Sequence, residues 1–391
     1  MFARNLVWLL GVVLLGAGGV YWLTDTAPEA PYVWSIPAHY PAPLVPADNP
    51  MSEAKVALGR YLFYDRKLAG NGKQSCADCH QQAHAFAEPL ATSIGSTGEL
   101  HHRNASALVN VAYNKTLTWS HPHLQEIERQ VLIPMFADNP VEMGIAGHEQ
   151  QVLKALARAP YPELFNAAFG DEEVNFLRVT QALASFVRSL VSFSSPFDRY
   201  AYQNDDSALS AQQLAGMELF FSERLECHHC HGGFNFTQST THQNQPINRF
   251  AFHNTGLYYT HQPQSGQWGY PEHDRGMIDV TLNPGDEGLF RAPTLRNVAF
   301  SAPYMHDGSI ATLSEVLDFY AAGGRVIATG PLAGDGRKHP NKNQFIKGFE
   351  LTEDEKQALL AFLESLSDAH FIRNKQYANP WLLDEQPAVD Q

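Results

Sequence analysis

Apolar residues recur with helical spacing in several stretches of the chain, and no stretch shows a convincing alternation of apolar and polar residues. A spacing of three and four residues places apolar side chains on one face of a helix, which can pack on a core. The strongest patterns predict helices over Glu149–Ala159, Asn175–Phe193, Ser210–Ser222, Leu313–Ala322 and Glu353–Ser367. The sequence therefore predicts a mainly α fold.

Capping residues locate two helix starts and one helix end. Thr312-Leu313-Ser314-Glu315 and Thr352-Glu353-Asp354-Glu355 both fit the capping box, in which a hydroxyl and a carboxylate bond the free backbone N–H groups. Gly323-Gly324 follows the first of these helices, and glycine readily takes the left-handed conformation that ends a helix. We therefore expect helices to begin after Thr312 and after Thr352.

The N-terminal part of the chain contains two segments that differ from the rest. Leu6–Leu23 carries no charged side chain, follows Arg4 and precedes Asp25, a pattern that predicts a membrane segment with its start in the cytoplasm. It favours an uncleaved anchor over a signal peptide within residues 1–25, and either way the folded part is exported. Residues 26–50 are rich in proline and predict an extended tether.

Length and charge limit the organisation of the chain and its partners. With 391 residues and 44% hydrophobic composition, the chain has room for two domains. Ser194–Asp198, which contains Ser195-Pro196, marks the expected boundary between domains at residues 51–196 and 197–391. A net charge of −14 without a basic block argues against nucleic acid as a partner.

An internal repeat precedes the cysteines of the chain. Gly59–Leu68 is echoed by Gly216–Leu225, and each copy leads into a Cys-x-x-Cys-His motif. The two motifs consist of Cys76, Cys79 and His80, and of Cys227, Cys230 and His231. The repeat predicts a helix and an attachment loop in each half.

The two motifs are typical of covalently attached c-type haem. Two thiols three residues apart can each form a thioether with one porphyrin vinyl group, and the adjacent histidine reaches the iron. Because the motifs use all four cysteines, the sequence predicts two c-type haems, with His80 and His231 as iron ligands. A zinc knuckle would need paired Cys-x-x-Cys motifs without the histidine, and a redox dithiol would need no histidine.

Two later motifs complete a resemblance to a known family. Phe290–Val298 reads Phe-Arg-Ala-Pro-Thr-Leu-Arg-Asn-Val, and Ala302–Gly308 reads Ala-Pro-Tyr-Met-His-Asp-Gly. With the haem motifs and the repeat, they resemble the bacterial di-haem cytochrome c peroxidase and MauG superfamily over roughly Ser52–Leu366. The resemblance implies two cytochrome c-like domains, each with one covalent haem, and an oxidoreductase that reacts with hydrogen peroxide.

Within this superfamily, the second axial ligand of the C-terminal haem separates two branches. The peroxidases place a methionine on the helix after the Pro-Tyr-x-His motif, and the MauG-like branch places a tyrosine, which matches Tyr320. A phenolate is a hard anionic donor that stabilises ferric and higher states, whereas a thioether favours ferrous iron. The alternative is a core tyrosine, because Tyr320 shares a helical face with Leu313 and Leu317.

The resemblance also implies an open site on the N-terminal haem. In the peroxidases a histidine can occupy the distal side, and the matching position is Ser96, so the iron is expected to be five-coordinate and able to bind peroxide. His101 and His102 are close enough in sequence to replace that histidine, but we expect both at the surface. A di-haem electron carrier without catalysis would need one of them as a ligand.

The catalytic residues implied by the resemblance surround this open site. Glu142 matches a carboxylate that moves a proton between the two peroxide oxygens. Gln130 and Pro134 match residues that line the same pocket, and Trp119 matches a tryptophan that relays electrons between the haems. Without the resemblance, Glu142 is an ordinary surface acid and Trp119 is a core residue.

A calcium ion between the haems is also implied. Asn104 matches a side-chain ligand, and Ser301 and Pro303 match positions that bind through backbone carbonyls, oxygen donors that suit a hard cation. The family usually has threonine at the position of Ser301, but a carbonyl ligand is insensitive to that change. His306 matches a family histidine near the edge of the C-terminal haem, and its role cannot be read from the sequence.

Two segments resemble one branch of the superfamily more than the others. Ser222–Phe236 and Pro340–Phe349 are most similar to the MbnH branch, di-haem enzymes associated with methanobactin and copper handling. This branch implies that hydrogen peroxide forms a high-valent di-haem state, which oxidises a tryptophan to kynurenine in a periplasmic copper-binding partner of the MbnP type. The alternative is a donor-dependent cytochrome c peroxidase, which reduces peroxide with electrons from a small redox protein.

Overall fold

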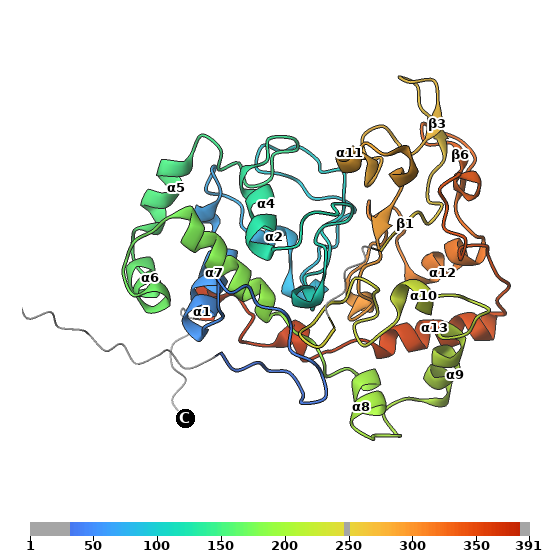
Figure 1. Cartoon of the computed structure of the whole chain (residues 1–391), viewed down its shortest axis with the longest axis horizontal. Coiled ribbons are helices and arrows are strands. Elements are labelled where there is room, and N and C mark those ends of the chain that lie inside the picture. Colours follow the sequence, from blue (N-terminus) through green and yellow to red (C-terminus); the bar gives the residue numbers. More distant parts are fainter. Residues whose placement is uncertain (1–31, 246–250, 384–391) are drawn as a thin grey trace, which may run out of the picture. The chain divides into compact units, whose positions relative to one another are not determined.

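The computed structural model describes residues 32–245 and 251–383, and helices predominate among them (Figure 1). The α-helices of the first half are α1 Glu53–Tyr64, α2 Cys76–Cys79, α3 Ile127–Gln130, α4 Leu132–Phe136, α5 Glu149–Leu156, α6 Tyr161–Phe169 and α7 Phe176–Ser189. Those of the second half are α8 Pro196–Tyr202, α9 Ala211–Phe220, α10 His228–His231, α11 Ile278–Thr281, α12 Leu313–Ala321, α13 Glu353–Ser365 and α14 Pro380–Leu383. Short 3₁₀ helices connect them: η1 Arg66–Leu68, η2 Gln82–His84, η3 Val111–Tyr113, η4 Pro284–Asp286, η5 Val298–Phe300, η6 Gly336–Lys338 and η7 Phe371–Arg373.

The predicted helices are present as α5, α7, α9, α12 and α13, each somewhat shorter than its sequence pattern. The hydroxyl of Thr312 accepts from the N–H of Glu315, and Thr352 caps α13 in the same way, so both capping boxes are confirmed. Gly323 follows α12 with φ +71°, a left-handed conformation that ends the helix.

Short strands are present that the sequence analysis did not predict. They are β1 Phe252–His253, β2 Thr260–His261, β3 Trp268–Gly269, β4 Phe290–Arg291, β5 Val326–Ile327 and β6 Gly334–Asp335. β1 pairs antiparallel with β4, with Phe252 opposite Arg291. The second sheet has the order β3-β2-β6-β5, also antiparallel, with Thr260 opposite both Gly269 and Gly334. An alternating pattern cannot be recognised in strands of two residues each.

The internal repeat corresponds to two similar helix pairs, α1 packed on α7 and α9 packed on α13 (Figure 1). A Cβ on Gly59 would lie 2.0 Å from the carbonyl oxygen of Ala182, and one on Gly216 would lie 1.9 Å from that of Ala358. No side chain fits at either crossing. Each glycine therefore lets two helices approach closely just before an attachment loop.

The proline-rich segment does not stand apart from the folded body over its described residues. Tyr40 is 6% exposed, and its hydroxyl donates a hydrogen bond to Asp198 at 2.5 Å. The predicted membrane segment Leu6–Leu23 lies outside the described residues. Within the described part of the chain, no helix has both the length and the apolar character needed to cross a bilayer.

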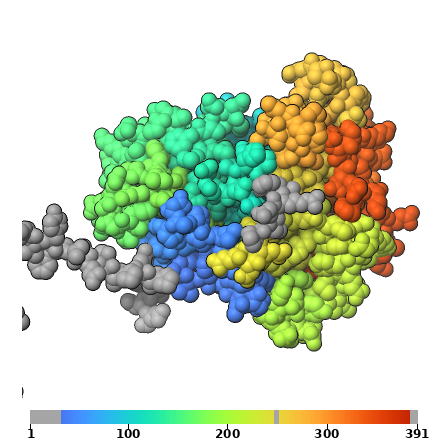
Figure 2. Space-filling view, viewed as in Figure 1, coloured from blue at the N-terminus to red at the C-terminus, as the bar shows by residue number. Residues whose placement is uncertain are grey.

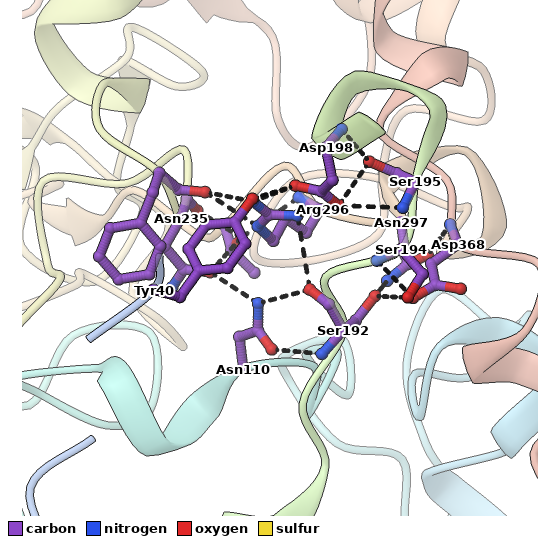
Figure 3. A network of polar contacts seen from close by, with 12 residues as sticks. Tyr40, Asn110, Ser192, Ser194, Ser195, Asp198, Asn235, Arg296, Asn297 and Asp368 are labelled. Carbon is purple, nitrogen blue, oxygen red and sulfur yellow. Dashed lines mark hydrogen bonds and ion pairs between the residues drawn. The ribbon is translucent and has the colours of Figure 1, made fainter. Parts of the chain in front are cut away.

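A buried ion pair lies at the expected domain boundary (Figure 3). Arg296 donates to both carboxylate oxygens of Asp198 at 2.9 Å, and the two side chains are 1% and 0% exposed. Although burial opposes it, the Arg296 guanidinium holds the pKa of Asp198 below its usual range. Tyr40 shares the same carboxylate, so three distant parts of the chain meet at Asp198.

Further polar contacts connect this pair to the first half (Figure 3). The N–H of Ser192 donates to the side chain of Asn110 at 2.7 Å, and the hydroxyl of Ser192 donates to Asp368 at 3.0 Å. Asn297 donates to the Ser192 hydroxyl at 2.9 Å and accepts from the N–H of Asp368 at 2.7 Å. The segment expected to separate two domains thus makes many contacts with both halves of the chain.

We expect Arg296→Met to lower the free energy of unfolding by about 3–5 kcal/mol, because it leaves the Asp198 carboxylate buried without its partner. Arg275→Met is the control, since the ion pair of Arg275 with Asp279 is exposed, with side-chain exposures of 39% and 36%, and should contribute about 1 kcal/mol or less. Urea unfolding of the haem-loaded proteins measures both. Equal unfolding midpoints for the two variants would contradict a structural role of the buried pair.

Candidate active site

Both cysteine motifs lie on short helical turns, α2 and α10. The N–H of His80 bonds the carbonyl of Cys76 at 2.9 Å, and the N–H of His231 bonds that of Cys227 at 3.0 Å. Residues three apart on a helical turn lie on the same side, as two thioethers to one porphyrin require. No disulfide joins any two of the four cysteines, so each remains available for a thioether. Burial raises the pKa of the Cys227 thiol to about 12 and that of Cys230 to about 11.

The two motif histidines are held in the same way. Nδ1 of His80 lies 2.8 Å from the carbonyl oxygen of Phe86, and Nδ1 of His231 lies 3.2 Å from that of Phe236. Because a carbonyl can only accept, each Nδ1 carries the proton and each Nε2 keeps its lone pair for a metal. Burial lowers the pKa of His231 to about 4 and also lowers that of His80, so both rings stay neutral. Both histidines are thus oriented and protonated as iron ligands.

A large apolar cavity adjoins the second motif. Cys227, Cys230 and His231 lie on its wall. Most of the remaining wall is apolar, with leucines such as Leu317 and Leu363. An apolar macrocycle needs such a cavity, so the residues present fit a haem attached at this motif.

Tyr320, on α12, lines the same cavity. Burial, together with the nearby Cys230 and Cys227, raises the pKa of its phenol far above the usual value. Its hydroxyl makes no hydrogen bond to any residue in the described ranges. Tyr320 also packs against the small apolar cluster that contains Phe319 and Leu257, so the core interpretation and the cavity position both apply to this residue.

Arg291 was not singled out from the sequence, although it lies within the Phe290–Val298 motif. Its side chain lines the cavity and is buried, with the whole residue 5% exposed. Nε donates to the carbonyl of Thr118 at 3.0 Å, but no ion pair joins Arg291 to an acid among the described residues. Burial lowers its pKa to about 10. A buried cation calls for an anion, and the propionate groups of a haem fit that requirement.

Glu142 lies close to the first motif. Burial raises the pKa of the Cys76 thiol to about 12, and the nearby Glu142 carboxylate adds to this increase. The carbonyl of Glu142 accepts from the N–H of Ser96 at 2.8 Å, and the N–H of Met143 donates to the carbonyl of Pro134 at 2.8 Å. The fold thus brings Glu142, Ser96 and Pro134 together, and burial raises the pKa of Glu142 to about 7.

Gln130 ends α3, just before the helix that contains Pro134. Its side-chain oxygen is buried and has no hydrogen-bond partner in the described part of the chain. An unbonded buried carbonyl is costly, so this oxygen is available to a bonding partner that the described residues do not supply.

The expectation that His101 and His102 both lie at the surface is wrong for His101. Its side chain is 11% exposed, and its Nδ1 lies 3.9 Å from the Glu142 carboxylate. Burial lowers the pKa of His101, so the ring beside Glu142 is neutral. His102 is exposed, and its ring lies 5.4 Å from that of His273. His101 is buried by contact with residues about forty positions later in the chain, such as Glu142.

Trp119 lies on the wall of the second cavity. Its indole N–H donates to the carbonyl of Asn104 at 2.9 Å. The N–H of Asn104 donates to the carbonyl of His306 at 2.8 Å. Asn104 is thus hydrogen-bonded to the loop that also contains Ser301 and Pro303. The residues expected around a calcium ion therefore share one region, beside Trp119.

His306, a second buried polar residue, also lines the cavity. The ring of His306 stacks on Phe290, with centroids 3.7 Å apart, and its Nε2 is 3.8 Å from Asp274. Arg103 donates two hydrogen bonds of 2.7 Å to Asp274. These contacts hold His306 in place on the cavity wall, and no motif in the sequence pointed to Asp274 or Arg103.

Comparisons with known proteins point to one family. Residues 53–207 match the family model for di-haem cytochrome c peroxidase. The chain is 35% identical to the cytochrome-c peroxidase IdrP1 of Denitromonas iodatirespirans, over 83% of this chain and 84% of that protein. It is 32% identical to the methylamine utilization protein MauG of Methylorubrum extorquens, over 82% of this chain and 80% of that protein.

Solved structures show the same fold. A crystal structure of a MauG-like protein associated with microbial copper homeostasis superposes with a TM-score of 0.84 and 43% identity, covering 90% of this chain and 99% of that one. The di-haem peroxidase BthA of Burkholderia thailandensis superposes with a TM-score of 0.64 and 23% identity, which supports the fold alone.

We expect the Glu142 carboxyl to titrate near pH 7 in the folded protein. Between the usual pKa of a glutamate and pH 7, the folded protein keeps the Glu142 proton that the unfolded chain has lost. The free energy of unfolding therefore falls as the pH rises through that window. Glu142→Gln should remove this decline in stability. Infrared difference spectra of wild type against Glu142→Gln, at pH 5 and pH 9, should contain a protonated carboxyl band only at the lower pH. A band already absent at pH 5 would disprove the raised pKa.

Proposed function

Because this chain belongs to the di-haem cytochrome c peroxidase and MauG family of oxidoreductases, we propose that it uses hydrogen peroxide to oxidise a residue of a partner protein. The main support for this proposal is the position of Tyr320, which lines the same cavity as His231. Two c-type haems, when bound, would supply the redox chemistry, taking oxidising equivalents from peroxide as it is reduced to water. A tyrosine ligand suits the storage of oxidising equivalents better than a methionine ligand.

The residues near the first motif have roles that fit peroxide cleavage. His80 would hold the iron, and Ser96 would leave the opposite side open. Glu142, with a pKa of about 7, can accept a proton from the inner peroxide oxygen and return it to the leaving oxygen at neutral pH. Gln130 and Pro134 would shape the pocket.

Between the two sites, we assign Trp119 the relay of electrons. Asn104, Ser301 and Pro303 would hold a calcium ion that fixes the loop beside it. The hydrogen bond from the Trp119 indole to the carbonyl of Asn104 supports this pairing of roles, because it couples the position of the ring to the loop.

For the substrate, we propose a tryptophan that is oxidised to kynurenine in a periplasmic copper-binding partner. The support is the 43% identity to a MauG-like protein described as associated with microbial copper homeostasis. Attachment of c-type haem and the apolar run Leu6–Leu23 both support a location in the periplasm, at the inner membrane.

The second candidate is a cytochrome c peroxidase that takes electrons from a small redox protein, because IdrP1 carries that name at 35% identity. A di-haem carrier without catalysis would need His101 or His102 on the first iron. His101 lies beside Glu142. The variant His101→Gln therefore tests, in the same experiments, whether His101 is a ligand of the first iron.

A chain of rings supports oxidation of a docked protein rather than of a small molecule in the cavity. Phe290, on the cavity wall, lies 5.8 Å from the ring of Tyr270. Tyr270 lies 5.5 Å from His339, which lies 5.2 Å from Tyr259. Tyr259 in turn lies 5.6 Å from Trp268, which is 53% exposed, and the β2–β3 hairpin lies at the surface, at the upper right of Figure 2. We propose that electrons from a docked partner hop through Trp268, Tyr259 and Tyr270. The last step to the cavity passes Phe290 by tunnelling, because phenylalanine is too hard to oxidise to hold the charge.

The first test is the addition of one equivalent of hydrogen peroxide to the fully oxidised protein, followed by optical and electron paramagnetic resonance spectra. We expect rapid loss of both ferric signals without prior reduction. Tyr320→Met should change the low-spin ferric spectrum, and Glu142→Gln should slow the reaction. A reaction that requires reduction of one haem would favour the donor-dependent peroxidase, and a protein inert to peroxide would favour the carrier.

We expect Trp268→Phe to leave the rate of reaction with peroxide unchanged and to lengthen the lifetime of the oxidised protein without a partner. The reason is that tryptophan is far easier to oxidise than phenylalanine, so the substitution removes the exposed end of the route. Mass spectrometry should find oxidation products at Trp268 in the wild-type protein. Trp34→Phe, outside the route, is the control. Equal lifetimes for the two variants would count against this route.

A further inference from the structure

Four potential metal ligands lie together on the loop of the second cysteine motif, within the segment Ser222–Phe236. Neither the resemblance nor the proposed reaction gives any of the four a role. His228 and His229 occupy the two positions between Cys227 and Cys230. Glu223 and Glu226 precede them in the connection from α9 to α10. We call this set the His–Glu cluster.

The distances within the His–Glu cluster match those between ligands of one metal ion. Nε2 of His228 lies 3.5 Å from one carboxylate oxygen of Glu223, and Nε2 of His229 lies 3.5 Å from the other. Ligand atoms of these three residues all lie within 4.8 Å of one another. With metal–nitrogen and metal–oxygen bonds of about 2.0–2.2 Å, tetrahedral ligand atoms are separated by about 3.3–3.6 Å.

Ordinary hydrogen bonds do not account for the close approach of Glu226. One of its carboxylate oxygens lies 2.7 Å from Nε2 of His229. Both atoms are nevertheless buried without a properly oriented hydrogen-bond partner among the described residues, as is Nδ1 of His228. Unbonded buried polar atoms are costly. A cation between the two would satisfy that nitrogen and the Glu226 oxygen together, with their separation widening from 2.7 Å to that of two ligands of one ion.

Contacts from the segment after α12 hold the ligands in place. The ring of His229 stacks on Phe345, with centroids 4.3 Å apart and planes at 11°. The ammonium group of Lys347 lies 3.3 Å from the second carboxylate oxygen of Glu226. One lysine offsets only one of the two carboxylates, so a cation is electrostatically favoured. Glu223 is 80% exposed, which leaves the cluster open to ions from solution.

We propose that Glu223, His228 and His229, with Glu226 as a fourth ligand, bind one divalent transition-metal ion. Imidazole nitrogen and carboxylate oxygen suit Zn²⁺ and Cu²⁺, and Cu²⁺ binds more tightly than Zn²⁺ at a given site of this kind. The bound ion would connect the end of α9 to the loop that carries both thioether bonds. It is a site separate from the haem iron, which His231 would bind.

The test uses the haem-loaded protein, freed of loosely bound metal with a chelator and desalted. We expect one equivalent of Cu²⁺ to bind per chain, with nitrogen couplings in its electron paramagnetic resonance spectrum, and Zn²⁺ to bind more weakly at the same site. His229→Gln and Glu223→Gln should each weaken binding by more than about tenfold. Glu223 is exposed, so its substitution should leave the haem content unchanged.

His121→Gln is the matched control, because the rings of His121 and His123 also lie close together, 6.2 Å apart, and neither residue belongs to the His–Glu cluster. It should leave Cu²⁺ affinity unchanged. The proposal is overturned if neither ion binds at one equivalent, or if Glu223→Gln and His229→Gln bind as tightly as His121→Gln. Haem content, measured on every variant, separates loss of the metal site from failed haem attachment.

Discussion

The buried ion pair of Arg296 and Asp198 is the constraint on which the arrangement of the two sites depends. Two charges without solvent are tolerated only when each faces the other in good geometry. The segment after α7 must therefore meet the Phe290–Val298 motif, and Tyr40 adds the proline-rich segment to the same point. Because that motif also contributes Arg291 to the cavity, the ion pair fixes the second site relative to the first half of the chain.

The two halves of the chain share the same backbone arrangement before each cysteine motif, but they place different side chains around it. Gly59 and Gly216 allow equivalent helix crossings, and each crossing precedes an attachment loop. Asn110 and Asn297 both have left-handed backbones, with φ of 55° and 60°, and each begins a short 3₁₀ helix. The difference between the halves therefore comes from the loops and from α12, which place Glu142 near one motif and Tyr320 near the other.

Burial adjusts the protonation of the groups that these sites need. A low-dielectric surrounding disfavours charge, so it lowers the pKa of His231 to about 4 and keeps a neutral imidazole available for iron. The same effect raises the pKa of Glu142 to about 7, where a carboxyl can both take and return a proton. One physical cause thus favours the proposed role of His231 as an iron ligand and the proposed role of Glu142 as a proton carrier.

The sequence by itself determined the features that depend on neighbouring residues. The spacing of Cys76, Cys79 and His80 predicts haem attachment because one helical turn brings them together, and the capping boxes at Thr312 and Thr352 locate helix starts because their contacts span three residues. The family followed from several such motifs in order. The proposed roles of Glu142 and Tyr320 came from that resemblance, since nothing local distinguishes them from a surface acid and a core tyrosine.

Only the tertiary structure decided which side chains are buried and which distant ones meet. It placed His101 beside Glu142, packed Tyr40 on Asp198, and left Arg291 without an acidic partner in the described part of the chain. It also brought Phe345 and Lys347 onto the His–Glu cluster. Burial and long-range proximity arise from the whole set of packing contacts, so no local pattern of residues encodes them.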